Sequence, residues 1–439
     1  MSLQQSSGYR PALAAVLALG IIGTLDFLVQ PLSVGMAVRD LSLSESQAGY
    51  FASFDLIGAV LSAVLALFWI RRLPWRSMAI ANLVLMAVGY LVATRLETLT
   101  ALAPVRILVG FAGGNLLAIS LAWLADTTHP ERFGGLLFAA QTVVQIVAFA
   151  LLPGTVLRAG GLDGFFLFFF GLAVLGLFCV PWIPIHGRRP RPMIRPSPAV
   201  GSAERATMTR FRAALALLGV GLFFLNTGAF WSYVERIGTA ADLGLEAIGL
   251  ALSASGFIAC AGSLAASRLG NKISLPWALG TAFVGQLLAL GLLLIDLTPA
   301  LYTLALGQFG FFWNFAMPYQ LGALIRNDPS GRRVVLLSAF QAAGMAGGPP
   351  LVALSVDSAG LIAMHWVAVA AGAASLLLFL VLHRYQPTID VYLACDPPTG
   401  SAADLEANEP PSGTQAVPLH RRPGAPIGAL DRERVGVSP

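Results

Sequence analysis

Three charged residues stand inside long apolar stretches of this 439-residue sequence: Asp26, Asp55 and Arg106. A charged side chain within a lipid bilayer is energetically costly, so each of them is a candidate functional residue. Loss of water favours the neutral form of a buried acid, whereas a nearby guanidinium favours the carboxylate. An aspartate beside Arg106 could therefore take up and release a proton. The simpler alternative is a static buried ion pair, and the sequence leaves open whether Asp26 or Asp55 is the partner.

Amide and aromatic side chains gather in the same kind of apolar stretch. Such groups suit a flat or amphipathic organic solute, because rings offer apolar contact while amides fix the orientation of the solute. The alternative is that they only join neighbouring helices through hydrogen bonds and packing. The residues that we predict to bind a solute are Gln141, Gln145, Asn226, Trp231, Trp313, Asn314, Tyr319 and Gln320.

The elements that carry these residues are predicted to be membrane-spanning helices. The sequence is 56% hydrophobic and only 11% charged, and its mean hydropathy is +0.76. This composition is typical of polytopic membrane proteins and excludes an ordinary soluble domain. A span needs roughly 20 mostly apolar residues, and we predict an all-α protein with twelve of them. They are 11–36, 47–70, 76–94, 99–125, 133–157, 163–185, 212–234, 246–268, 275–295, 299–325, 333–356 and 360–383.

Basic residues predict the orientation of these spans. The stretch 186–212 holds seven arginines and one acid, and such loops stay in the cytoplasm. With both termini inside, the inner segments hold eighteen arginines and lysines and the outer loops hold four. The sequence therefore predicts a multi-pass protein of the cytoplasmic membrane, surrounded by lipid bilayer, with both termini in the cytoplasm. Glu235-Arg236 then ends the seventh span, where an interfacial anchor is expected.

The two halves of the sequence repeat at a register near 200 residues. Leu73-Pro74-Trp75 returns as Leu275-Pro276-Trp277, and Gly110-Phe111 returns as Gly310-Phe311. Ordered matches across six spans indicate a six-helix duplication, which is typical of transporters that bind their solute between two halves. We predict a six-helix bundle at 1–185, a basic linker at 186–211, a second bundle at 212–384 and a disordered tail at 385–439.

Other classes of function lack the residues that they need. Lys272 is the only lysine and is followed by isoleucine, so a P-loop is excluded. The three cysteines and five histidines are scattered along the sequence, which predicts no disulfide framework, no metal and no cofactor. No clustered basic face suggests binding to nucleic acid. We expect a monomer that is not an enzyme.

Three motifs resemble those of the major facilitator superfamily, and the resemblance covers residues 10 to about 384. Arg106-x3-Gly110-x3-Gly114 is similar to the family's arginine motif, which is associated with proton coupling. Residues 126–134 resemble the family's acidic turn, with 328–332 as the counterpart, and 267–272 resemble its basic inner loop. The resemblance implies inner gating loops, which here contain Asp126, Arg132, Arg268, Lys272, Asp328 and Arg332.

The resemblance also implies a function. Spans one and four would line a central cavity, so that Asp26 faces Arg106 as in the proton site of some sugar–proton symporters of the family. The family's Gly-x3-Gly-Pro antiporter motif is missing from span five. We therefore expect a proton-coupled symporter that imports a small organic solute by alternating access, with Asp26 as the coupling group. The alternatives are a proton-driven drug or metabolite efflux antiporter and, from another class, a non-transporting membrane sensor.

Overall fold

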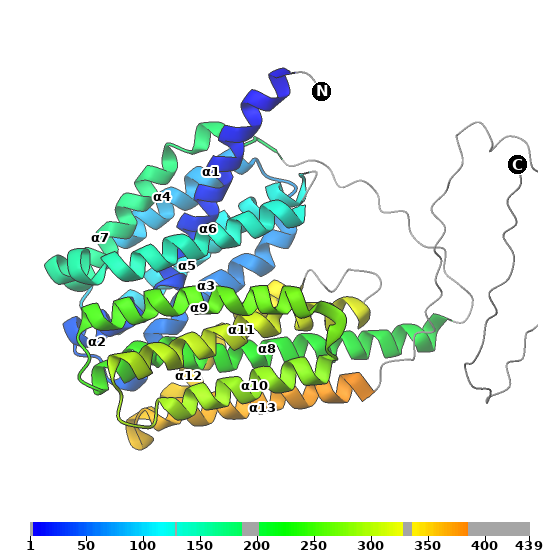
Figure 1. Ribbon diagram of the computed structural model, residues 1–439. Helices are drawn as coiled ribbons and strands as arrows, with labels where there is room; N and C mark the ends of the chain where they lie inside the picture. The colour runs from blue at the N-terminus through cyan, green and yellow to red at the C-terminus, as the bar shows by residue number, and fades with distance from the viewer. Residues whose placement is uncertain (1–2, 128–129, 187–201, 328–335, 385–439) are drawn as a thin grey trace, which may run out of the picture. The chain divides into compact units, whose positions relative to one another are not determined.

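The computed structural model describes residues 3–127, 130–186, 202–327 and 336–384, and every regular element in these ranges is a helix (Figure 1). The first half contains α1 (Leu3–Leu28), α2 (Gln30–Leu41), α3 (Glu45–Trp69), α4 (Trp75–Ala93), α5 (Leu99–Ala125), α6 (Pro130–Leu151), the π-helical turn η1 (Pro153–Leu157), α7 (Arg158–Leu177) and the 3-10 turn η2 (Val180–Trp182). The second half contains α8 (Ser202–Ala240), α9 (Leu245–Leu269), the 3-10 turn η3 (Gly270–Lys272), α10 (Leu275–Leu292), α11 (Pro299–Asn327), α12 (Leu337–Ala359) and α13 (Ile362–Arg384). The all-helical fold is thus confirmed. Most of the predicted linker and the whole predicted tail lie outside the described residues.

The helix boundaries repeat with the register expected from the sequence. α3, α4 and α5 begin at residues 45, 75 and 99, and α9, α10 and α11 begin at residues 245, 275 and 299. The turns before α3 and α9 also match, because Ser42 and Asp242 both have positive φ angles, of 51° and 57°. Residues other than glycine seldom adopt this conformation. The repeat therefore extends from sequence to backbone geometry, while the exact limits of two separate bundles stay a prediction.

Prolines interrupt two of the predicted spans. The span 11–36 is two helices, α1 and α2, separated at Val29, whose ψ of 17° is not helical. Pro31 has no N–H to bond to the carbonyl of Phe27, and its ring would clash with that carbonyl. The expectation of one continuous helix over 11–36 is therefore wrong. Likewise, Pro153 follows the end of α6 and begins the π-helical turn η1 that leads into α7.

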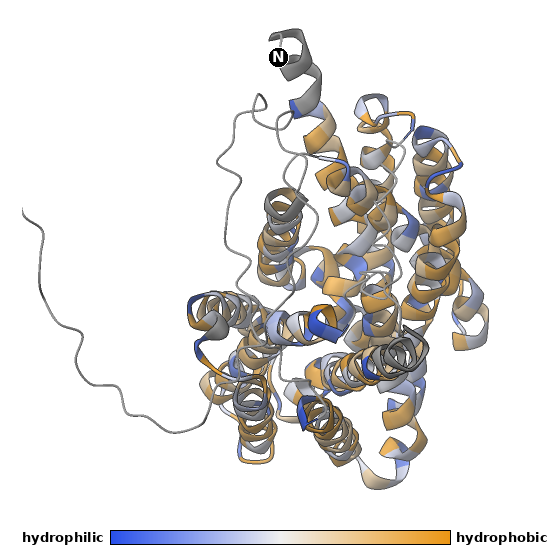
Figure 2. Cartoon of the chain, turned by 90° about the vertical axis from the view of Figure 1, so that its right-hand side faces the viewer, coloured by the Kyte–Doolittle hydropathy of each residue, from blue (hydrophilic) through white to orange (hydrophobic). Residues whose placement is uncertain are grey.

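The outward-facing side chains along the helices are apolar. Leu354, Trp277 and Phe178 are 74%, 74% and 69% exposed, and Figure 2 shows hydrophobic colouring along the helices, with hydrophilic residues mainly at their ends. A soluble monomer rarely exposes so much contiguous apolar surface. Within the described ranges, nine helical stretches are long and apolar enough to cross a membrane. The protein is therefore a multi-pass membrane protein, and twelve crossings stay a prediction.

The two halves pack together most closely near one end of the helices. This end contains the turns at 42–44 and 242–244 and is named the outer end below, after the predicted topology. One buried core joins first-half residues such as Phe149 to second-half residues such as Phe230 and Val352 there. A second core, around Phe224 and Phe379, belongs mainly to the second half. Between the halves, α3 contacts α12, α6 contacts α9 and α2 contacts α8.

Candidate functional site

Asp26, Asp55 and Arg106 meet in one buried cluster. Arg106, which is 0% exposed, donates from Nη1 to Oδ2 of Asp26 at 2.9 Å and from Nη2 to Oδ1 of Asp26 at 3.4 Å. The same Nη2 contacts Oδ2 of Asp55. Asp26 and Asp55 are 7% and 5% exposed. The sequence left open which aspartate pairs with Arg106, and in the structure both carboxylates share the one guanidinium.

Close helix packing brings the three residues together. A Cβ at Gly110 of α5 would overlap the backbone of Asp55, and a Cβ at Gly58 of α3 would overlap the carbonyl of Ile107. Glycines at such crossings let two membrane helices approach backbone to backbone. Gly110 lies one turn after Arg106, so the spacing in Arg106-x3-Gly110 sets the depth at which Arg106 meets Asp55.

Aromatic residues that the sequence did not single out complete the cluster. Tyr90 of α4 is fully buried and donates its hydroxyl to Oδ2 of Asp26 at 2.7 Å. The Arg106 guanidinium lies over the rings of Phe51 and Phe166, at 5.0 Å and 5.7 Å from their centroids. Rings in this position attract a cation while excluding water. Tyr90 interrupts an apolar span in the sequence, but no spacing links it to the acids.

The cluster holds two acids for one base. Asp26 accepts hydrogen bonds from Tyr90 and twice from Arg106, so both of its oxygens are satisfied. Oδ1 of Asp55 has no hydrogen-bond partner among the described residues, and neither has Nε of Arg106. A carboxylate that accepts several hydrogen bonds is stabilised in its charged form. The two aspartates therefore sit in unequal surroundings.

The two glutamines of α6 that we predicted to bind a solute hold α1 in this structure. Nε2 of Gln141 donates to Oγ1 of Thr24 at 2.8 Å and to the carbonyl of Gly20 at 3.1 Å. Nε2 of Gln145 donates to the carbonyl of Leu28 at 2.9 Å. That carbonyl belongs to the last residue of α1, just before the break at Val29. These contacts are the helix-joining bonds of the alternative interpretation.

Two of the predicted aromatic residues lie at the boundary between the halves. The Trp231 ring is 5.9 Å from the ring of Phe149 of α6 and 6.3 Å from the ring of Trp313 of α11. Nε1 of Trp313 is buried without a hydrogen-bond partner among the described residues. An unpartnered donor beside rings packed edge to face is a suitable contact for a flat, polar solute.

The predicted amides of the second half are divided between helix bonds and a small cavity. Nδ2 of Asn226 donates to Oε1 of Gln286 at 2.9 Å, and Nδ2 of Asn314 donates to the carbonyl of Gly310 on its own helix at 3.0 Å. Neither Nε2 nor Oε1 of Gln320 has a hydrogen-bond partner among the described residues, and the hydroxyl of Tyr319 also lacks one. The structure thus leaves Gln320 and Tyr319 with unused hydrogen-bonding groups.

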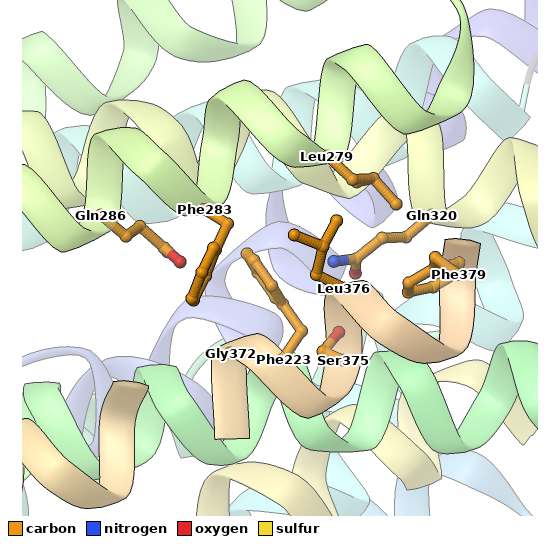
Figure 3. Close-up of a pocket in the computed structure, with 9 residues that line it drawn as sticks. All are labelled: Phe223, Leu279, Phe283, Gln286, Gln320, Gly372, Ser375, Leu376 and Phe379. Atoms are coloured by element: carbon orange, nitrogen blue, oxygen red, sulfur yellow. The ribbon is translucent and has the colours of Figure 1, made fainter. Parts of the chain in front are cut away.

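Gln320 lines a cavity within the second half, and not between the halves (Figure 3). The cavity has about 10 Å³ of room for the centre of a water-sized molecule, which is roughly one water. Figure 3 shows the polar ends of Gln286, Gln320 and Ser375 among aromatic rings. The lining residues are Phe223, Leu279, Phe283, Gln286, Gln320, Gly372, Ser375, Leu376 and Phe379. In this conformation the cavity is too small for an organic solute.

The predicted gating loops are only partly described. Asp126 ends α5 and accepts Nη1 of Arg71 at 2.6 Å, which ties the loop after α3 to α5 within the first half. Arg268 and Lys272 are exposed at the end of α9 and in η3. Arg132 lies in α6, but its side chain is outside the described part of the chain, as are Asp328 and Arg332.

Polar contacts between the halves concentrate at the outer end. Glu45, the first residue of α3, receives Nη2 of Arg236 at 2.7 Å and Nε of Arg236 at 3.0 Å. Ser46 donates its hydroxyl to Asp357 of α12 at 2.6 Å and its backbone N–H to the same carboxylate at 3.0 Å. Deeper in the protein, Oγ of Ser232 donates to Gln30 of α2 at 3.2 Å. These bonds close the outer end.

A fold of packed apolar helices defines an integral membrane protein, and its buried charged cluster is a candidate functional site. Residues 13–333 match the family model described as Major Facilitator Superfamily, and the chain belongs to this family. Members of the family move small solutes across membranes.

One curated relative is a nucleoside efflux pump. The purine ribonucleoside efflux pump NepI of Salmonella paratyphi A is 25% identical to this chain over 237 residues, which cover 52% of this chain and 57% of that protein. The chain thus matches a little over half the length of this curated relative.

Solved structures share the fold. A D-xylose–proton symporter aligns with a TM-score of 0.65, at 16% identity, over 86% of this chain and 98% of its own. A mutant of the nucleoside transporter NupG aligns with a TM-score of 0.62, at 16% identity, over 84% of this chain and 99% of its own. A bacterial homologue of the human lysosomal transporter Spinster, in an inward-facing and unoccupied conformation, aligns with a TM-score of 0.61, at 12% identity, over 84% and 94%.

Proposed function

We propose that the protein is a proton-coupled secondary transporter of a small organic solute, and that the Asp26–Arg106–Asp55 cluster binds the coupling proton. The observation that carries this proposal is the ratio of two buried carboxyl groups to one buried guanidinium. With both acids ionised, the cluster would hold one net negative charge within the membrane, which is unfavourable. One bound proton makes it neutral.

The surroundings of the two acids favour Asp55 as the residue that holds the proton. Asp26 accepts hydrogen bonds at both oxygens, which favours its carboxylate form. Asp55 has a free Oδ1, so protonation there breaks no hydrogen bond within the described residues. We therefore assign proton binding to Asp55 and the positioning of Arg106 to Asp26, which refines the expectation that Asp26 alone is the coupling group.

Alternating access would follow from the arrangement of the two halves. The contacts of Glu45 with Arg236 and of Ser46 with Asp357 close the outer end. A conformation closed outside would let solute and proton exchange with the cytoplasm. Opening of the outer end requires these contacts to break. Access of the solute from outside therefore depends on whether α2 and α3 are packed on the second half.

The aromatic residues between the halves support a flat solute. Trp231, Trp313 and Phe149 offer ring faces beside the unpartnered Nε1 of Trp313. Purine ribonucleosides are the first class of solute to test, because they combine a flat base with hydroxyl groups. They are also the solutes in the name of the relative NepI. The name of NepI also favours a second candidate function, which is efflux; the proposed cluster would then exchange a proton for the solute.

Transport into proteoliposomes tests the proposal. We would measure counterflow of labelled purine ribonucleosides and of D-xylose, followed by uptake driven by an imposed pH gradient. Asp55→Asn should abolish accumulation driven by the gradient while keeping counterflow, because the variant cluster is neutral without a proton. Ser62→Ala, which changes a buried polar residue two turns further along α3, is the matched control and should keep both activities.

The direction of movement separates the two candidate functions. Symport requires the solute to accumulate on the side toward which protons flow, and antiport requires the opposite. Gradient-driven accumulation by Asp55→Asn at the wild-type level would remove Asp55 from coupling. Absence of counterflow across a broad panel of solutes would contradict transport itself.

A further inference from the structure

Glu235 is a buried acid that the proposed proton cluster does not use. It lies in α8 near the outer end and is 3% exposed, so it is not the exposed interfacial anchor that the sequence suggested. Its Oε1 accepts the hydroxyl of Thr239 at 2.7 Å. Its Oε2 is buried and has no hydrogen-bond partner among the described residues.

The first half of the protein covers this carboxyl group directly. Gly35 of α2 lies against it so closely that a Cβ at position 35 would overlap the carboxyl atoms. Tyr302 of α11 donates its hydroxyl to the carbonyl of Val234, the residue before Glu235, at 2.7 Å. The carboxyl group is therefore shielded from water only while α2 rests on α8, that is, while the outer end is closed.

The charges around Glu235 are already paired with other groups. Arg236 directs Nε and Nη2 to Glu45 of α3, and its Nη1 is 3.9 Å from Oε2 of Glu235, which is too far for a hydrogen bond. Arg39 of α2 pairs with Asp40 at 2.7 Å and is largely exposed. Glu45 and the phenol of Tyr302 are further titratable groups near Glu235, and neither supplies a positive charge. A charged Glu235 would thus share the Arg236 guanidinium with Glu45, at a longer distance and without a hydrogen bond to it.

We propose that Glu235 is a second proton-binding site, which takes up a proton from the outer solution when the outer end closes and releases it when that end opens. In the closed protein a neutral carboxyl avoids the cost of a buried charge that shares its one nearby cation with Glu45. When α2 separates from α8, water reaches the carboxyl group and the carboxylate is stabilised. Because the proton binds the closed form preferentially, acidification shifts the population toward that form.

This proposal rests on the alternating-access part of the proposed function but not on the cluster at Asp26. The test places spin labels at Thr100→Cys and Ala300→Cys, two exposed positions at the outer ends of α5 and α11, after replacement of the native cysteines by serine. Distances between the labels are measured by pulsed electron resonance in lipid nanodiscs from alkaline to mildly acidic pH. In the labelled protein with Glu235 intact, the population with the shorter distance between the labels should increase as pH falls.

Variants at Glu235 decide the outcome. Glu235→Gln, a neutral mimic of the protonated acid, should show the short distance at every pH. Glu235→Asp keeps a titratable group and should keep the pH dependence, with a shifted midpoint. Asp163→Asn, which changes an exposed acid at the same end, should behave like the wild type, and Asp55→Asn should still shift toward the shorter distance as pH falls. Gly35→Ala should favour the longer distance, because a methyl group there displaces α2.

Three results would overturn the proposal. The first is an unchanged pH dependence in Glu235→Gln, which would move the proton site elsewhere and leave the proposed transport function untouched. The second is a pH dependence that disappears in Asp55→Asn but survives in both Glu235 variants, which would assign the effect to the central cluster. The third is a distance that changes with neither pH nor added solute, which would count against outer opening as well.

Discussion

Arg106 is the residue on which both central acids depend. Replacing it by glutamine removes the single cation within contact of Asp26 and Asp55 in the described structure. Breaking a buried ion pair by removing one partner costs about 3–5 kcal/mol. Arg106→Gln should therefore lower the free energy of unfolding by up to that amount in detergent titrations. The double variant with Asp55→Asn should be more stable than Arg106→Gln alone; equal or lower stability would show that Asp55 does not draw its stability from Arg106.

Tyr90 is expected to set which aspartate takes the proton. Its hydroxyl donates to Asp26, and a hydrogen bond to a charged group contributes about 1.5–3 kcal/mol. Tyr90→Phe should make Asp26 compete with Asp55 for the proton, so that the midpoint of the pH profile of counterflow moves while the maximum rate changes little. Tyr50→Phe, which removes the hydroxyl of a partly exposed tyrosine outside the cluster, is the control. A common shift in both variants would mean a general effect of lost tyrosines.

Residue types were predictable from the sequence, but partnerships were not. The cost of charge in a membrane was enough to single out Asp26, Asp55 and Arg106. Their three-way contact depends on how α1, α3 and α5 are rotated about their axes, and the packing of glycines decides that rotation. Tyr90 was missed for the same reason, because only packing turns its hydroxyl toward Asp26.

The crossing of α3 and α5 depends on two small residues. A methyl group at Gly110 would meet the backbone of Asp55, which cannot move without shifting a whole helix. Overpacking of this kind costs about 1–3 kcal/mol. Gly110→Ala should therefore lower the melting temperature and uncouple transport, as the helix shift separates Arg106 from Asp55. Gly280→Ala in α10, where nothing lies near the added methyl group, should be neutral or slightly stabilising. Equal melting temperatures would contradict the tight crossing.

The bond between α3 and α12 at the outer end should be independent of pH in the neutral range. Hydrogen bonds from Ser46 hold the pKa of Asp357, which lies just beyond the predicted span, below its usual value. A lowered pKa means that the bond is fully present above the ordinary value of about 3.9 and is lost only as pH falls through the lowered value. Asp357→Asn should thus loosen the outer end equally at all neutral and mildly acidic pH values. A midpoint of the pH dependence of the label distances that disappears in Asp357→Asn while Glu235 is intact would contradict this and implicate Asp357 in proton sensing.

Helix starts were more predictable than helix continuity. The spans predicted to begin at 99, 275 and 299 begin there in the structure, because Thr98 and the prolines near 276 and 299 mark the starts. The breaks at Val29 and Pro153 were not predicted, although both prolines are visible in the sequence. Apolar composition alone does not show whether a proline bends a span or ends a helix.

In the whole molecule, the excess of arginine and lysine in the inner segments predicts which side of the membrane each end of the protein faces. Single cysteines introduced at Gly201 and Leu41, in a background without native cysteines, should react from opposite sides of the membrane. Gly201 belongs to the basic linker and should be labelled only from the cytoplasm, whereas Leu41 precedes the outer turn. Labelling of both positions by an impermeant reagent applied to intact cells would contradict the topology. The repeat and the family followed from patterns that extend over hundreds of residues, as does the prediction of twelve spans, whereas the closed outer end depends on side-chain pairs that no such pattern contains.

The composition of α11 and α12 has a consequence for the insertion of the protein into the membrane. Neither is apolar enough to qualify as a span by composition, because α11 carries Gln308, Asn314 and Gln320 and α12 holds two adjacent prolines. A segment leaves the translocon for lipid according to its apolarity, so these two should insert poorly by themselves. Each packs against a more apolar helix synthesised earlier, α11 against α9 and α12 against α8 and α3. Biogenesis should therefore retain α8 and α9 near the translocon until the last helices emerge, and the second half should enter the bilayer as a group.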